Sequence, residues 1–269
     1  MAKRYYNLEK ETKAYLKACD DRGVIPSVSS SLFNDYALIA KARNNNSEFL
    51  KTYPFGFNNL ITWLDASISA SYPQTGTTIF DLSINKNNGT LLNSTTFTGD
   101  SGGGISLMPR GDKYISLNYN LGVDFTIQIT AKNQNFVAWS TLFGNDIWNS
   151  TLGVLAYFET STKIVFRASN SFNISFIGVD ITRTNVYTFT HAANGAAAIY
   201  VNGIGVASGN FNFTPANNGT YIGSRHQNTG LSFNDLWGGI IYNTKIYNRS
   251  LTQSEALDSF NIEKSKFNL

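Results

Sequence analysis

A run of alternating side chains, interrupted by two Asn-Gly pairs, constrains the fold of this chain more than any other feature. The run spans Val186–Gly209, and the pairs are Asn194–Gly195 and Asn202–Gly203. Asn-Gly favours two-residue type I′ turns, because both central residues of that turn need a positive φ. Alternation before the first turn places three bulky side chains on one face: Tyr187, Phe189 and His191. The run therefore predicts an antiparallel meander of three strands, which needs a second sheet to cover it.

The composition fits a large β domain and argues against several other classes of protein. The chain has 269 residues, of which 14% are charged and 14% are aromatic. Low charge with abundant aromatic residues and turn formers is typical of short strands joined by tight turns. The net charge of +3 is too small to indicate a nucleic-acid partner or an acidic membrane surface. The single cysteine, Cys19, excludes an internal disulfide framework.

Residues 1–57 differ in character from the rest of the chain. They contain two short stretches with helical periodicity, separated near Pro26, and predict a helical N-terminal segment for anchoring or oligomerisation. Two short helices cannot build a core of their own, so we expect them to pack on another surface. The N-terminus lacks the apolar stretch of a signal peptide, and no run reaches membrane-spanning length. We therefore expect synthesis in a cytoplasm and no membrane partner.

Residues 58–269 follow the two-residue period of β-strands. Turn signals recur about every ten residues, a spacing that favours a sandwich or barrel. The expected strands are Leu60–Asp65, Tyr114–Leu117, Phe125–Ile129, Lys163–Phe166, Ile174–Ile177, Gly219–Gly223 and Gly238–Tyr247. A short helix is predicted to close the domain over Ser250–Leu257, where Ser or Thr followed by Glu forms a capping signal.

Several segments, taken in order, carry a family resemblance. They are Leu64–Ala66 with Tyr72–Pro73, Asp81–Leu91, Gly111–Ile115, the meander to Gly209, Tyr221–Ser224 and Gly239–Glu255. Together they resemble the concanavalin A-like, laminin-G-like jelly roll over roughly residues 58–262. This resemblance implies a mainly β fold, a jelly-roll sandwich of two antiparallel sheets. The closing run to Phe267 is also similar to the ends of such domains in virion proteins of tailed bacteriophages.

The same jelly roll houses β-glucanases, so an enzyme is the first alternative to consider. Their catalysis needs two close carboxylates, which that family carries as Glu-x-Asp-x-x-Glu on one strand. The triplet is missing here, and of the six glutamates only Glu159 falls within the predicted sheets. Nucleophile patterns, phosphate-binding loops and zinc spacings are not recognisable either. We therefore expect a protein without enzymatic activity.

The turn-rich corner Asp81–Leu91 contains weak candidates for a calcium site. Asp81, Asn85 and Asn88 offer the hard oxygen ligands that calcium prefers. One carboxylate and two amides are few for a calcium cage, whereas Asp and Asn commonly cap turns of their own backbone. A structural turn is therefore the favoured interpretation, and no cofactor is expected unless calcium binds here.

Candidate carbohydrate-binding residues lie in polar loops. Sugar recognition uses exposed aromatic rings that stack on sugar faces, with Asn, Asp and Arg as polar partners. Trp148 follows the loop Gly144–Ile147, whereas three other tryptophans are predicted to pack in the core: Trp63, Trp139 and Trp237. The candidates are Trp148, Asp146, Asn149, Tyr157, Arg225 and His226. A solvated loop is the alternative for His226, and His191 is predicted to pack beside its aromatic neighbours.

The resemblance leads to one hypothesis and one alternative. The hypothesis is a non-enzymatic virion structural protein, serving as capsid decoration, head fibre or tail component. Its N-terminal segment would bind other virion proteins and drive homo-oligomer formation, a trimer being common for such projecting proteins. Display in many copies would let weak contacts with host surface polysaccharide act through avidity. The alternative is a bacterial carbohydrate-binding module without a virion role, for which a secretion signal would be expected.

Overall fold

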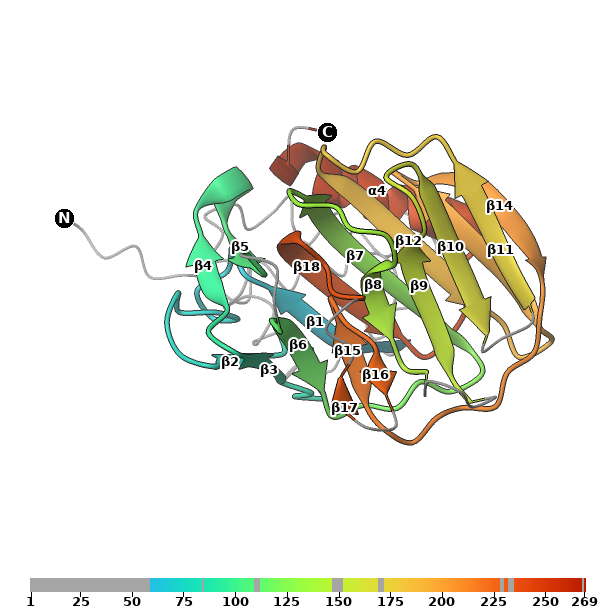
Figure 1. The fold of residues 1–269 in the computed structure, drawn as a ribbon, viewed down its shortest axis with the longest axis horizontal. Coiled ribbons are helices and arrows are strands. Elements are labelled where there is room, and N and C mark those ends of the chain that lie inside the picture. Colours follow the sequence, from blue (N-terminus) through green and yellow to red (C-terminus); the bar gives the residue numbers. More distant parts are fainter. Residues whose placement is uncertain are drawn as a thin grey trace, which may run out of the picture. The chain divides into compact units, whose positions relative to one another are not determined.

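The computed structural model describes residues 59–83, 85–108, 112–146, 152–168, 172–227, 230–231, 235–267 and 269. The side chains of residues 226–227, 230–231, 262 and 265 lie outside this description. The helical segment predicted for residues 1–57 lies outside it as well. The described part forms a sandwich of two antiparallel sheets, which is the architecture that the resemblance implied (Figure 1).

The first sheet contains the predicted meander at one edge. Its strands run in the order β14 (Ile204–Asn210), β13 (Ala196–Val201), β12 (Asn185–His191), β7 (Phe125–Asn133), β18 (Gly239–Tyr247), β5 (Gly104–Ser106) and β4 (Thr96–Thr98). Strand β1 (Leu60–Asp65) also pairs with β18. The single-turn 3-10 helix η2 (Asp100–Gly102) lies in the glycine-rich turn between β4 and β5.

The second sheet covers the first. Its order is β11 (Phe172–Ile177), β10 (Lys163–Ala168), β9 (Val154–Phe158), β8 (Ser140–Gly144), β15 (Thr220–Ile222), β6 (Tyr114–Leu117), β3 (Gly89–Leu92) and β2 (Thr78–Ile79). Neighbouring strands are antiparallel in both sheets. A small hairpin of β16 (His226–Gln227) and β17 (Gly230–Leu231) follows β15. The seven strands predicted from alternation are all present, several of them longer than predicted.

Aromatic rings fill the space between the sheets. Phe189 on β12 meets Phe143 on β8 and Phe166 on β10, with ring centroids 5.3 and 5.5 Å apart in edge-on geometry. His191 continues this layer, with Nδ1 2.6 Å from the Val123 carbonyl and Nε2 2.8 Å from the Phe211 carbonyl. The prediction that His191 packs in the interior is confirmed, since it is buried among rings with both nitrogens against backbone oxygens.

The two Asn-Gly pairs of the meander behave differently. Asn202 and Gly203 join β13 to β14 with φ of 52° and 75°, as a primed two-residue turn requires. At the other pair the type I′ prediction is wrong, because Gly195 has a positive φ (89°) and Asn194 does not. Instead, Oδ1 of Asn194 accepts a hydrogen bond from the Ala196 N–H, and residues 192–195 form a longer loop.

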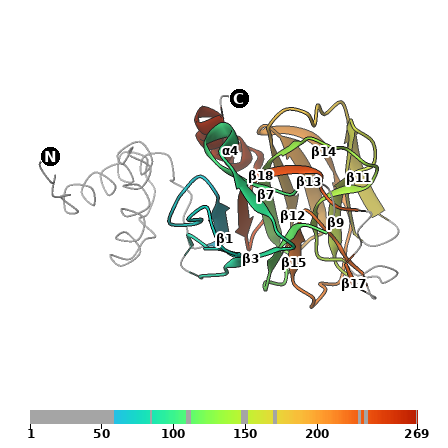
Figure 2. The same cartoon turned by 60° about the vertical axis from the view of Figure 1, so that its left-hand side comes forward.

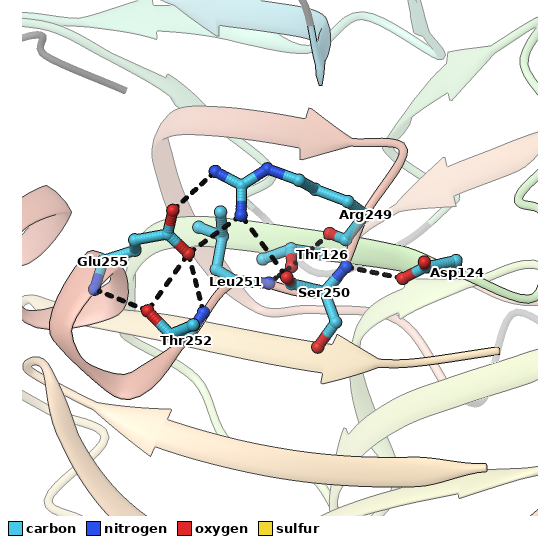
Figure 3. A network of polar contacts seen from close by, with 7 residues as sticks. All are labelled: Asp124, Thr126, Arg249, Ser250, Leu251, Thr252 and Glu255. Carbon is cyan, nitrogen blue, oxygen red and sulfur yellow. Dashed lines mark hydrogen bonds and ion pairs between the residues drawn. The ribbon is translucent and has the colours of Figure 1, made fainter. Parts of the chain in front are cut away.

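The C-terminal helix α4 (Gln253–Phe267) is longer than the predicted Ser250–Leu257 segment. It begins with the predicted capping signal: the Thr252 N–H donates to Oε2 of Glu255, and the Glu255 N–H donates to Oγ1 of Thr252 (Figure 3). Arg249 donates to both carboxylate oxygens of Glu255, at 2.7 and 2.8 Å. The sequence signal for the helix start is thus confirmed. Within the described residues, no helix has the length and apolar character needed to cross a membrane.

Helix α4 packs on the outer face of the first sheet (Figure 2). Polar contacts join the two. Ser259 donates to Gln128 on β7, whose neighbours Ile127 and Ile129 point into the core. Lys245 on β18 forms an ion pair with Glu263 on α4, with 2.5 Å between Nζ and Oε1 and both side chains buried. The helix is therefore held by a desolvated charge pair and by the apolar contact of Phe267 with Ile240 and Tyr242 on β18.

Candidate functional site

The outer face of the second sheet, opposite the core, carries the best-formed cluster of aromatic and charged side chains. On β9, Ala156 and Phe158 point into the core, so Leu155 and Tyr157 point outward. On β10 the same alternation turns Val165 and Arg167 outward. Leu155, Tyr157 and Val165 form a small apolar cluster separate from the main core. This cluster is the floor of the candidate site.

Trp139 extends the floor from the loop before β8. Its ring stacks on Tyr157 with centroids 4.9 Å apart and planes inclined by 21°. The prediction that Trp139 packs in the core is wrong, because the residue is 41% exposed. Its φ of 69° is a left-handed conformation that costs a non-glycine residue about 1–3 kcal/mol. An exposed indole on a strained backbone is a feature that binding sites use and that core packing does not require.

Arg167 reaches Tyr157 from the opposite side, because β10 and β8 flank β9. Its guanidinium carbon lies 5.6 Å from the centre of the Tyr157 ring, within range of a cation–π interaction. Burial raises the pKa of the Tyr157 hydroxyl, against the opposing effect of the Arg167 charge. Tyr157 therefore remains a neutral ring between an indole and a guanidinium.

An ion-paired arginine borders this platform. Arg225 is 2% exposed, and its guanidinium donates to Asp146 at 2.6 Å and to Asp235 at 3.2 Å. The backbone of Arg225 packs against Gly144 on β8, where an added Cβ would lie 2.9 Å from the Cα of Arg225. Burial raises the pKa of Asp146 to about 6, although the Arg225 and Arg167 charges oppose this shift. The pair fixes the loop after β15 against the end of β8.

The structure brings together three of the six predicted carbohydrate-binding residues. Arg225 contacts Asp146 directly, and the Arg225 charge lowers the pKa of the Tyr157 hydroxyl against the effect of burial. Trp148, Asn149 and the side chain of His226 lie outside the described residues.

Sequence reasoning missed Trp139, Arg167 and Asp235. For Arg167 a signal was present, because it alternates with Ile164 and Phe166 and so had to face outward. For Asp235 no local signal exists, since its role depends on an arginine brought close by the fold.

The calcium candidates form a hydrogen-bonded corner. The Asp81 carboxylate accepts four hydrogen bonds, from the backbone N–H groups of Trp63, Ser83 and Asn87 and from the Ser83 hydroxyl. Asn88 accepts from the Asp81 N–H, and Asn85 donates to the Ile61 carbonyl. The side-chain oxygens of Asp81 and Asn88 thus accept hydrogen bonds within the turn, and a cation here would have to compete with these donors. Elsewhere in the described part, no group of three or more His, Cys, Asp or Glu residues is placed to hold a metal ion.

Two surface cavities lie away from the platform. One, of about 350 Å³, is lined by Phe136, Thr162 and Val179 and their neighbours. The other, of about 380 Å³, lies on the first sheet beside Tyr200 and Leu251. Neither is lined by Trp139 or by the Arg225 ion pair. The exposed Trp139 ring, stacked on the buried Tyr157, is therefore a candidate separate from both cavities.

The sheet order defines a jelly-roll sandwich of two antiparallel sheets, of the concanavalin A-like fold. Solved structures with this fold superimpose on the chain at low sequence identity. The receptor-binding domain of botulinum neurotoxin type G matches with a TM-score of 0.58 and 16% identity, over 77% of this chain and 52% of that one. Domain 4 of an extracellular arabinanase from Geobacillus stearothermophilus, solved with arabinotriose, matches with a TM-score of 0.56 and 17% identity, over 74% of this chain and 97% of that one.

Trypanosoma rangeli sialidase, solved with sialic acid, matches with a TM-score of 0.55 and 17% identity, over 77% of this chain and 33% of that one. The chain thus spans about half the length of the neurotoxin domain and a third of the sialidase, but nearly all of the arabinanase domain. At these identities the likeness establishes the fold. No protein-family model matches the chain, and no curated protein sequence matches it.

Proposed function

We propose that the jelly roll is a non-enzymatic carbohydrate-binding module whose binding face is the platform of Trp139 and Tyr157. The observation that carries the proposal is the exposed, strained indole stacked on a buried tyrosine. The exposed Trp139 ring offers a sugar an apolar surface, with Tyr157 supporting it from below, while neighbouring charged groups supply hydrogen bonds. The arabinanase domain that was solved with arabinotriose gives further support, because it shares the sandwich over nearly its whole length.

Affinity measurements on matched variants test this proposal. The purified chain is titrated with bacterial surface polysaccharides by calorimetry, beside Trp139→Ala and Phe80→Ala. Phe80 is the control, because it is also an exposed aromatic residue but lies next to β2, at the far edge of the second sheet. Loss of a central aromatic contact costs about 2 kcal/mol, or roughly 30-fold in Kd, so only Trp139→Ala should weaken binding by this amount. Equal affinities of the three proteins would refute the placement of the site.

We also propose that the module acts on a bacteriophage particle. The support is the similarity of the closing run Phe260–Phe267 to the ends of jelly-roll domains in virion proteins of tailed bacteriophages. The distinct segment 1–57 would attach the module to other virion proteins and make it oligomeric. Mass spectrometry and immunogold labelling of purified particles test the location. Deletion of residues 1–50 tests the attachment, because the truncated protein should no longer enter particles. A protein absent from particles but present on the bacterial surface would favour the alternative of a bacterial carbohydrate-binding module.

A further inference from the structure

Among the residues that the structure describes on the outer face of the second sheet, one cation has no carboxylate partner. Arg225 is neutralised by the carboxylates of Asp146 and Asp235. Lys163, on the same face of β10, lies 2.5 Å from the carboxylate of Glu159. The Arg167 side chain differs from both, since it has neither an ion pair nor a hydrogen bond with any residue that the structure describes, and its Nε is buried without an acceptor.

An arginine in this state is prepared for an anionic partner. Leaving a buried N–H without an acceptor is unfavourable, and a guanidinium forms its strongest hydrogen bonds with planar carboxylates. The stacking contact with Tyr157 restricts the side chain in advance, so less conformational freedom is lost when an anion binds. The half-buried position of Arg167 also reduces screening of its charge by solvent.

The position of Arg167 relative to the platform indicates what carries the anion. Trp139 and Arg167 contact the same tyrosine ring from opposite sides, at centroid distances of 4.9 and 5.6 Å. The indole and the guanidinium therefore lie within the length of two sugar rings. Because Tyr157 covers one face of the indole, a sugar ring has to stack on the other face. A ligand of several linked sugars is therefore needed to reach Trp139 and Arg167 together.

We propose that the ligand is an acidic glycan whose sugar carboxylate binds Arg167 while a sugar ring stacks on Trp139. This inference rests on the proposed carbohydrate-binding function and narrows it to uronic or sialic acid polymers. Arg225 does not bind the anion, because its own carboxylate partners already occupy it; it positions the loop that borders the platform.

Paired ligands test the inference without any mutation. The full-length protein is titrated with oligogalacturonate, hyaluronan and polysialic acid, each beside the same polymer after chemical reduction of its carboxylates to alcohols. Loss of a charge-assisted hydrogen bond should weaken binding of the reduced form about tenfold. Equal binding of an acidic polymer and its reduced form would overturn the carboxylate assignment but leave the carbohydrate-binding function intact. Failure of every polymer, acidic or reduced, to bind would overturn both.

Two matched variants assign the effect to a residue. Arg167→Gln should remove the preference for the acidic form, whereas Lys163→Gln, which deletes a paired cation on the same strand, should retain it. A thermal melt of each variant confirms that the domain is folded before titration. If Arg167→Gln keeps the full preference, Arg167 only packs on Tyr157 and the inference is wrong.

Discussion

The substitution Glu263→Gln tests the buried ion pair that fastens α4 to the first sheet. It removes the carboxylate 2.5 Å from Nζ of Lys245, a residue with 0% exposure, while Lys245 itself stays buried. Removing one member of such a pair costs about 3–5 kcal/mol, because the remaining charge is still desolvated. For a domain of this size we therefore expect Tm to fall by about 6–20 °C.

The control for this prediction is a pair of the same chemistry at the surface. Glu159 and Lys163 are also 2.5 Å apart, but their side chains are 36% and 30% exposed, so Glu159→Gln should cost at most about 1 kcal/mol. Urea denaturation of the three proteins, followed by circular dichroism, gives the free energies of unfolding. The double variant Lys245→Met/Glu263→Leu should recover part of the loss, because it leaves neither charge buried, although the Asn243 amide loses its acceptor on Glu263. If the free energy of unfolding of Glu263→Gln is within about 1 kcal/mol of the wild-type value, the pair does not hold the helix.

Three further predictions concern stability. Gly203→Ala should destabilise the domain by about 1–3 kcal/mol, because the φ of Gly203 is 75° and the new Cβ would lie 2.9 Å from the Cα of Leu257 on α4. Urea denaturation measures this loss, and an unchanged free energy of unfolding would contradict the tight turn. Burial alone would raise the pKa of Glu255, but hydrogen bonds from Arg249 and the Thr252 N–H hold it below the ordinary 4.5. The stability that Glu255 contributes should thus be complete above that pH and be lost as pH falls through the lower folded-state pKa, a loss that Glu255→Gln should not show in acid titrations. Asp146 should give the opposite pH dependence of stability. Its pKa rises from 3.8 to about 6 on folding, so wild type should lose stability relative to Asp146→Asn as pH increases from about 4 to 6. A constant difference over that interval would contradict the raised pKa.

Local chemistry was sufficient to predict most of the sandwich. Alternation is a property of neighbouring residues, so β6 (Tyr114–Leu117) could be placed to the residue and β18 nearly so. Short edge strands were missed, because two to four residues, as in β2, carry too little periodicity. Helix α4 was predicted too short, since its second half faces the sheet with polar residues such as Glu263 instead of an apolar stripe.

The candidate site was predictable only in part, for a physical reason. The sequence around Arg225 predicts a polar loop. In the fold, the Arg225 side chain is buried and pairs with the carboxylate of Asp146, 79 residues away. Such pairs are set by the fold and leave no local pattern. Trp139 shows the converse: an apolar residue before a strand predicts burial, and only its left-handed backbone and the neighbouring Tyr157 show that its ring is presented outward.

The indole N–H signals of the four tryptophans provide the most direct test of the binding face. In a nitrogen–proton correlation spectrum, the signal of Trp139, assigned by its absence in Trp139→Phe, should shift progressively as an acidic oligosaccharide is added. The signals of Trp63 and Trp237, which are 0% exposed, should remain in place and serve as internal controls. Saturable binding that shifts the Trp139 signal would support the platform. Saturable binding that leaves the Trp139 signal unmoved would show that sugars bind elsewhere and would contradict the account.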